Sequence, residues 1–194
     1  MTCSAWALGG ELLDTVTASF RAALQRCSAT AGEGSDPDVF LAFLDSSPDV
    51  FHRDHPPGHF TGSAWLISGD GQRVLLTHHR KLNRWLQLGG HADGERDLAH
   101  VALREAEEES GLTDLRVDPD IFDLDRHWIP ERGIEPGHWH YDVRYVVRAC
   151  GSEHFAVSAE SLALAWMPVE ALIAEPATDA SLRRMAQRWI ARGR

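Results

Sequence analysis

The sequence predicts an α/β (α+β) sandwich of strands and helices. Strand-like runs of apolar residues lie on both sides of one central acidic helix. A second amphipathic helix ends the chain, and a helical stretch precedes the first strand. Strands that surround a central helix, with a further helix at the end, favour such a layered arrangement.

Two helices are expected within residues 1–50. Residues 11–26 and 37–46 both place apolar side chains at helical spacing. The first set is Leu12, Leu13, Val16, Phe20, Ala23 and Leu24, and the second is Phe40, Leu41, Phe43 and Leu44. This extension is too short to bury much of a core alone. We expect it to form a cap or a homodimer surface on a main domain at residues 51–194.

Short strands are expected throughout the main domain. Residues 60–68 and 73–78 flank Gly69-Asp70-Gly71, which is typical of a hairpin turn. Residues 85–88 lead into the glycines before the acidic helix. Further strands are expected at 114–118, 121–128, 138–149 and 162–167. The final helix should begin near Asp179 and turn Leu182, Met185, Trp189 and Ile190 inward.

The acidic helix has recognisable ends and an unusual inward face. Asp97 is a favourable N-cap, and Gly111 can adopt the left-handed conformation that ends a helix. Between them, residues at inward helical spacing are Leu98, Val101, Ala102, Glu105, Glu108 and Glu109. The three glutamates span an arc of about 100°. An apolar stripe is therefore continued by three carboxylates.

Carboxylates on a partly buried face repel one another and resist desolvation, unless a cation lies between them. Magnesium prefers oxygen ligands of this kind. A solvated charged face is the alternative, but it does not explain why Glu105, Glu108 and Glu109 continue an apolar stripe. Glu107 points away from the others and fits that alternative.

Gly90 and the run Arg104-Glu105-Ala106-Glu107-Glu108-Glu109-Ser110-Gly111-Leu112 resemble the signature of the Nudix hydrolases. That signature is Gly, five residues, Glu, seven residues, Arg-Glu, an apolar residue, any residue, Glu-Glu, any residue, Gly and an apolar residue. The spacing fits from Gly90 to Leu112. One position departs, because Arg96 stands where the early Glu is expected.

The resemblance implies the Nudix fold, in which a mixed β-sheet is sandwiched between helices. It also implies a metal-dependent hydrolase of diphosphate linkages in nucleoside diphosphate derivatives. It implies that Glu105, Glu108, Glu109 and the carbonyl of Gly90 bind Mg²⁺ or Mn²⁺. Arg104 would orient a helix glutamate through a charge-assisted pair. The ions would neutralise the diphosphate and activate the attacking water.

Overall composition is that of an ordinary globular protein. The chain has 194 residues and a net charge of -10, which argues against nucleic acid as a partner. No apolar run reaches membrane-spanning length, and no signal peptide is expected. Three scattered cysteines, Cys3, Cys27 and Cys150, indicate neither a disulfide framework nor a zinc knuckle. A cytoplasmic protein with a small-molecule substrate is expected.

Residues 138–147 alternate with period two, as a half-buried strand does. One face carries His138, His140, Asp142 and Arg144, and the other carries Trp139, Tyr141, Val143, Tyr145 and Val147. The polar face is either a functional site or an ordinary solvent-exposed sheet face.

A second resemblance bears on these histidines. Residues 59–66, the turn at 69–72 and Gly90-His91 are similar to the isopentenyl-diphosphate isomerases, which have the Nudix fold. The spacing of their metal ligands implies a second, transition-metal site, and its ligand positions here are His52, His59, His91, His138 and His140. Imidazole ligands suit zinc or a similar ion.

The same comparison counts against isomerase activity. Gly89 occupies the position of the isomerases' catalytic cysteine, whereas the acidic helix keeps the hydrolase form. Two alternatives to the hydrolase remain, an isomerase-like enzyme and a non-catalytic nucleotide-binding Nudix module. Candidate phosphate-binding residues are Arg80, Lys81, Arg84 and Arg144, and candidate bases are Asp142, Glu131 and Glu135. The sequence does not choose among the bases.

Overall fold

The computed structural model describes residues 5–28, 36–157 and 161–193, with the side chains of residues 5–12 and 28 left out. Its helices are α1 (Ala5–Ser28), α2 (Pro37–Leu44), α3 (Leu98–Ser110), α4 (Val169–Ala174) and α5 (Ala180–Ala191). Its strands are β1 (Gly58–Ile67), β2 (Arg73–His79), β3 (Arg84–Leu86), β4 (Leu88–His91), β5 (Leu115–Ile129), β6 (His138–Ala149) and β7 (Ser161–Pro168). Cys3 and the side chain of Leu12, both named in the sequence analysis, lie outside the part of the chain that the structure describes.

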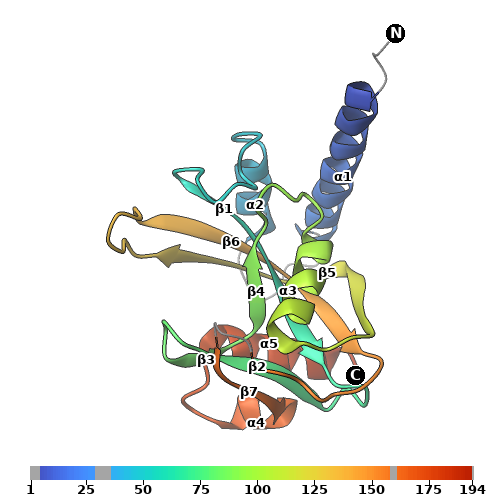
Figure 1. Ribbon diagram of the computed structural model, residues 1–194, viewed down its shortest axis with the longest axis vertical. Helices are drawn as coiled ribbons and strands as arrows, with labels where there is room; N and C mark the ends of the chain where they lie inside the picture. The colour runs from blue at the N-terminus through green and yellow to red at the C-terminus, as the bar shows by residue number, and fades with distance from the viewer. Residues whose placement is uncertain (1–4, 29–35, 158–160, 194) are drawn as a thin grey trace.

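The seven strands form one mixed sheet with the order β3-β2-β1-β6-β5, while β4 pairs with β1 and β7 pairs with β2. Strands β1 and β6 run parallel along ten paired positions, and the other pairings are antiparallel. The paired ends of β5 and β6 project from the body as a long hairpin (Figure 1). The mixed sheet between helices that the sequence predicts is confirmed.

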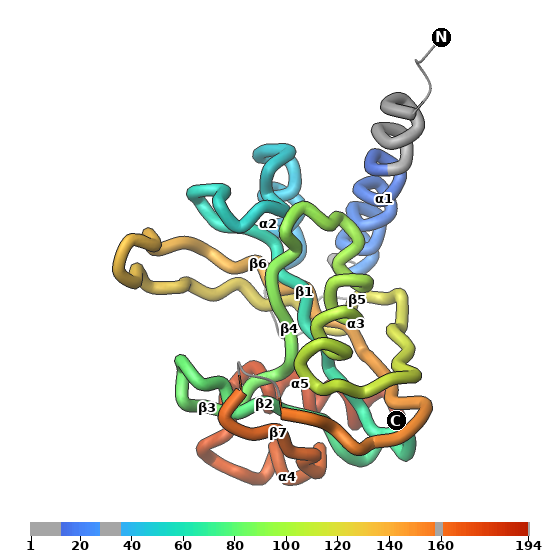
Figure 2. Tube along the Cα trace, viewed as in Figure 1, coloured from blue at the N-terminus to red at the C-terminus, as the bar shows by residue number. Residues whose placement is uncertain are grey.

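Two apolar cores cover the two faces of the sheet. Phe20 of α1, Phe40 of α2 and Val101 of α3 share one core with Phe60 of β1. On the other face, Trp65 packs with residues of α4 and α5, which are Val169, Leu172, Leu182, Met185, Ala186 and Trp189. The tube view shows α1 and α2 on the upper side of the sheet and α4 and α5 at the bottom (Figure 2). The N-terminal helices are therefore part of the main core.

The structure differs from the sequence prediction at β5. Two strands were expected at 114–118 and 121–128, but a single strand runs from Leu115 to Ile129. Its register against β6 shifts between Val117 and Asp123, around Pro119. Because β5 is an edge strand, a proline without an N–H group interrupts its pairing without ending it. The sequence also missed the short helix α4.

Helix α5 begins where the sequence predicts. Asp179 caps it by accepting a hydrogen bond from the Ser181 N–H (2.9 Å). Its inward face carries Met185 and Trp189, and the indole N–H of Trp189 donates to the carbonyl of Gly71 (2.9 Å). The helix is thereby fixed to the β1–β2 turn. None of the described helices is both long enough and apolar enough to span a bilayer.

Gly62 determines how closely α3 approaches the sheet. A Cβ atom at this position would lie 2.9 Å from the carbonyl oxygen of Leu98 and 2.9 Å from the side chain of Val101. Both contacts are well inside van der Waals distance. The absence of a side chain at Gly62 therefore allows α3 to pack directly on β1.

We expect Gly62→Ala to lower the free energy of unfolding by about 1–3 kcal/mol, because overpacking forces α3 away from β1. The measurement is urea unfolding followed by circular dichroism. Gly69→Ala is the matched control, since a Cβ there meets its nearest atom at 3.4 Å, an ordinary contact. Equal unfolding midpoints for the two variants would contradict this account of the packing.

Candidate functional site

Helix α3 has the ends that the sequence predicts. Asp97 accepts hydrogen bonds from the backbone N–H groups of Ala99 and His100 (both 3.1 Å). Gly111 ends the helix with a left-handed φ of 67°. The buried face is Leu98, Val101, Ala102, Ala106 and Ser110, and it packs against β1 and β4. These contacts hold the acidic side chains of α3 beside Gly89 and Gly90 of β4.

Two glutamates of α3 contact the glycines that precede it. The Gly89 N–H donates to Glu109 Oε1 (2.8 Å). The carboxylate of Glu105 lies over Gly90, so closely that a Cβ there would be 2.5 Å from Glu105 Oε2. Any larger residue at position 90 would displace this carboxylate. The glycine pair and the two glutamates therefore form one arrangement.

Glu108 lies differently from the sequence prediction. Its side chain is 64% exposed, whereas that of Glu105 is 17% exposed. The buried stripe instead continues through Ala106 and Ser110. Consequently Glu108 lies at the rim of the arrangement, where water reaches it.

Arg104 connects α3 to β4. Its Nη2 donates to Glu105 Oε1 (2.9 Å) and to the carbonyl of His91 (3.1 Å). A looser contact of 3.9 Å joins its Nε to Glu108 Oε1. The guanidinium thus orients Glu105 and offsets part of the negative charge on the helix face.

The oxygen atoms around Gly90 of β4 fit a hard divalent cation. Carboxylate oxygens of Glu105 and Glu109 and the backbone of Gly90 are the oxygen ligands that Mg²⁺ and Mn²⁺ accept. The space over Gly90 exists only because that residue has no side chain. The residues present therefore match the metal that the acidic helix predicts.

A group of histidines lies on the opposite face of the sheet. Each of His59, His91 and His140 offers one ring nitrogen, and these nitrogens lie within 4.8 Å of one another. The three residues come from β1, β4 and β6. His138 is adjacent, with its Nε2 atom 3.2 Å from that of His140. His52 is exposed and rests against Gly94, outside the three-nitrogen group.

The imidazoles of His59, His91 and His140 are held in the neutral form. Burial, reinforced by the neighbouring rings, lowers the pKa of His59 to about 3 and that of His140 to about 2. Burial also lowers the pKa of His91, and Arg53 adds to this effect. Neutral rings keep a lone pair available for a ligand.

A buried ionic network lies next to the histidines on the same face. Asp142 accepts hydrogen bonds from the hydroxyls of Thr61 (2.9 Å) and Ser63 (2.7 Å), and from Gln87 Nε2 (3.2 Å). Arg144 Nε donates to Asp142 Oδ2 (2.7 Å). Both oxygens of Asp142 are therefore engaged, and its side chain is only 2% exposed. This environment suits an anchor better than a base.

The network extends to α5 through Asp123. This carboxylate is fully buried and contacts Arg144 (3.2 Å), Arg184 (2.7 Å) and Arg188 (3.0 Å). Burial by itself would raise the pKa of neighbouring Asp125. However, a hydrogen bond from His127 and the charges of Arg144 and Arg184 hold that pKa well below its usual range. Sequence reasoning missed this network, since its partners are far apart in the chain.

The structure separates the candidate phosphate-binding residues. Arg80, Lys81 and Arg84 are exposed on the segment at the ends of β2 and β3. Arg84 forms a surface ion pair with Asp179 (3.1 Å). Arg144, by contrast, has a side chain that is 3% exposed and surrounded by carboxylates. Its geometry favours a structural role over the expected contact with phosphate.

The candidate bases also lie in different settings. Glu131 and Glu135 are exposed near the tip of the β5–β6 hairpin, where an isolated bridge pairs Glu135 with Arg132. Asp142 lies within the buried network. The three candidates therefore lie in two different environments, the exposed hairpin tip and the buried ionic network.

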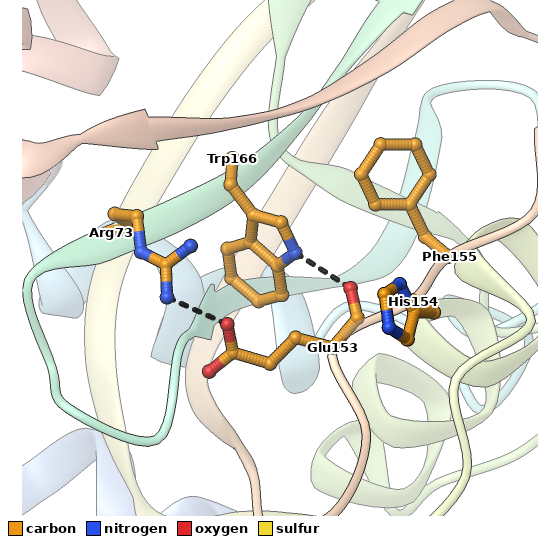
Figure 3. Close-up of a pocket in the computed structure, with 5 residues that line it drawn as sticks. All are labelled: Arg73, Glu153, His154, Phe155 and Trp166. Carbon is orange, nitrogen blue, oxygen red and sulfur yellow. Dashed lines mark hydrogen bonds and ion pairs between the residues drawn. The ribbon is translucent and has the colours of Figure 1, made fainter.

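A separate surface pocket of about 510 Å³ lies between β2, β7 and the segment after β6 (Figure 3). Its lining residues are Arg73, Glu153, His154, Phe155 and Trp166. Arg73 donates to Glu153 Oε2 (2.7 Å), and the indole N–H of Trp166 donates to the carbonyl of Glu153 (3.0 Å). None of the residues predicted for the site lines this pocket, so we assign it no part in catalysis.

His127 is a further residue that sequence reasoning missed. It lies opposite His140 in the β5–β6 register, with ring centroids 5.4 Å apart. Its Nδ1 atom is 3.1 Å from Asp125 Oδ1. Alternation along β5 could have placed Asp123, Asp125 and His127 on one face, but their pairing with β6 required the register.

A mixed sheet between helix layers, with a carboxylate-bearing helix against a pair of glycines, is the arrangement of the Nudix hydrolases. Residues 59–189 match the model of the NUDIX domain, and the chain belongs to this family. No curated protein matches the chain in sequence.

Solved structures share the fold at low sequence identity. A C. elegans Ap4A hydrolase has a TM-score of 0.54 and 18% identity, covering 68% of this chain and 95% of its own. The MutT protein from Methanosarcina mazei Go1 has a TM-score of 0.53 and 18% sequence identity, and the match covers 70% of this chain and 94% of that protein. The E. coli dihydroneopterin triphosphate pyrophosphohydrolase has a TM-score of 0.54 and 16% sequence identity, and the match covers 69% of this chain and 95% of that protein. At these identities the likeness shows the fold alone.

We expect Asp123→Asn to lower the free energy of unfolding by about 3–5 kcal/mol, because it removes one partner from a buried charge network. Urea unfolding measures the change. Asp45→Asn is the control, since Asp45 pairs with Arg21 on the surface and should shift the midpoint little. A small effect at both positions would show that the buried network contributes little.

Proposed function

We propose that the chain is a Mg²⁺- or Mn²⁺-dependent hydrolase that cleaves a diphosphate linkage in a nucleoside diphosphate derivative. The observation that carries this proposal is the contact of Glu105 and Glu109 with Gly89 and Gly90 of β4. Family membership supports hydrolysis as the reaction type. An Ap4A hydrolase and a dihydroneopterin triphosphate pyrophosphohydrolase share the fold, but their names point to different phosphate compounds.

The carboxylates of α3 and the backbone of Gly90 would bind one cation together. Glu105, Glu109 and the Gly90 carbonyl would hold the cation, with Glu108 completing the set from the rim. When bound, the cation supplies charge neutralisation of the diphosphate and lowers the pKa of a coordinated water. Arg104 keeps Glu105 in place through its hydrogen bond and prevents it from turning toward solvent.

Glu108 is also suited to receive the proton of the attacking water. Its carboxylate is the most exposed of the three and lies 3.9 Å from Arg104 Nε. Glu131 and Glu135 would serve only if the hairpin tip came over the substrate.

Substrate phosphates would meet basic residues at the ends of β2 and β3. Arg80, Lys81 and Arg84 are exposed there on a short connecting segment. Arg80 already donates to the carbonyl of Ser161 (3.1 Å), which restricts its movement. We leave Arg144 out of this role because its guanidinium is buried among carboxylates.

The packing around Gly89 argues against an isomerase. A Cβ atom there would lie 2.3 Å from Ser63 Oγ and 2.8 Å from the Ser63 backbone. The residue therefore provides no thiol, and its surroundings leave no room for one. A non-catalytic binding module is disfavoured because the acidic helix retains all three carboxylates and their partner Arg104.

A substrate screen tests the proposal directly. Nucleotide sugars, dinucleotides, nucleoside triphosphates and prenyl diphosphates would be incubated with the protein in Mg²⁺ and then in Mn²⁺, with product analysis. We expect hydrolysis of at least one nucleoside diphosphate derivative and none without a divalent ion. Turnover that persists after chelation would contradict the proposed mechanism.

We expect Glu108→Gln to lower kcat about 100-fold or more, the scale of a lost electrostatic contribution to the transition state. The variant should stay folded, since removing one charge from a repelling cluster does not destabilise it. Glu107→Gln is the matched control, because Glu107 is exposed on the same helix and points away. A Glu108→Gln variant with wild-type kcat would refute the assignment.

The purified protein should not interconvert isopentenyl and dimethylallyl diphosphate. The reason is the missing thiol at Gly89 and the close approach of Ser63. Incubation with either compound, followed by separation of the two, measures this. Interconversion at a rate comparable to the best hydrolysis would favour the isomerase alternative.

A further inference from the structure

The strongest unexplained feature of the molecule is the buried ring of His59. Its side chain is 1% exposed, and neither Nδ1 nor Nε2 has a hydrogen-bond partner among the described residues. A buried polar group without a partner is costly, so such atoms normally meet a protein group, a water or an ion. The ring therefore requires a ligand that the described part of the chain does not provide.

The neighbours of His59 indicate what kind of ligand this is. Its ring centroid lies 5.0 Å from that of His91 and 4.7 Å from that of His140. One nitrogen from each of the three rings falls within a common distance of 4.8 Å. Among the described residues, no other set of three histidine, cysteine or acidic side chains meets this criterion. Three imidazole nitrogens therefore lie near one another on this face of the sheet.

The orientation of the rings is fixed from outside the group. His138 Nδ1 is 2.9 Å from the carbonyl of Pro136, which makes Nδ1 the donor and leaves Nε2 as an acceptor facing His140. His127, held by Asp125, packs against the other side of His140. Such supporting contacts commonly orient histidine ligands.

We propose that His59, His91 and His140 bind one divalent transition-metal ion of the zinc type. Three neutral imidazoles are a ligand set that zinc, copper, iron and nickel accept, and magnesium does not favour. The set leaves a fourth position open to a water or a substrate oxygen. His138 and His127 are positioning residues for this site.

The site is separate from the carboxylates of α3, although both involve β4. Successive residues of a strand face opposite sides of its sheet. Gly90 therefore faces Glu105, and His91 faces His59 and His140. The proposed transition-metal site goes beyond the hydrolase proposal, because it uses other ligands and a chemically different ion.

Metal binding without any activity measurement tests the proposal. Protein purified without a histidine tag would be stripped with a chelator and titrated with Co²⁺ and Zn²⁺ in excess Mg²⁺, which occupies oxygen sites. We expect one equivalent of Co²⁺ to bind with visible d–d absorption, and Zn²⁺ to displace it. Failure of the wild type to bind a stoichiometric transition metal would overturn the proposal and leave water as the partner of His59.

Substitutions identify the ligands. His91→Asn and His140→Asn should each abolish the stoichiometric binding, whereas His100→Asn, at an exposed position of α3, should retain it. Retention of one equivalent in both ligand variants would refute the assignment. Circular dichroism verifies that each variant is folded.

A further variant separates this inference from the hydrolase proposal. Glu105→Gln combined with Glu109→Gln should lose hydrolysis but still bind one equivalent of Zn²⁺ in excess Mg²⁺. Zn²⁺ should also raise the melting temperature of the wild type and of this double variant, but not that of His140→Asn. Loss of zinc binding in a folded double variant would mean that the carboxylates, and not the histidines, hold the ion.

Discussion

The parallel pairing of β1 with β6 determines most of what is described above. Ten residues of each strand are in register, from Gly58 opposite Trp139 to Ile67 opposite Arg148. This pairing places His59 beside His140 and Thr61 beside Asp142, although about eighty residues separate each pair along the chain. Because side chains alternate along both strands, the polar side chains of His59, Thr61 and Ser63 share one face of the sheet with those of His140, Asp142 and Arg144. The opposite face of β1 is left to Gly62 and α3.

The polar face is stabilised where it is most deeply buried. Charges removed from water are costly unless they are paired and hydrogen-bonded. Asp142 accepts hydrogen bonds from four side chains, and Asp123 contacts three arginines, two of them on α5. The network thereby joins the last helix to the centre of the sheet. Nearer the β5–β6 hairpin the same face carries histidines in place of carboxylates. There the two ring nitrogens of His59 have no hydrogen-bond partner among the described residues.

Local sequence features predicted what depends on local physics. The N-cap at Asp97, the left-handed Gly111 and the alternation of β6 follow from neighbouring residues, and the structure has them all. Long-range register did not follow, so the partners of Arg144 and the place of His127 were missed. Helical spacing predicted that Glu108 points the same way as Glu105. It did not predict that Glu108 is much more exposed than Glu105. The assignment of the carboxylates and histidines to metals remains a prediction.

Strand β4 is only four residues long, from Leu88 to His91, and its alternation has a consequence for variation of this chain. Inserting or deleting one residue before Gly90 would reverse the direction of every side chain in the strand. Position 90 would then face the imidazoles, and position 91 would face α3. The length of this segment is therefore under tighter constraint than most of its side chains. Substitution can alter either face alone, whereas a change in length alters both at once.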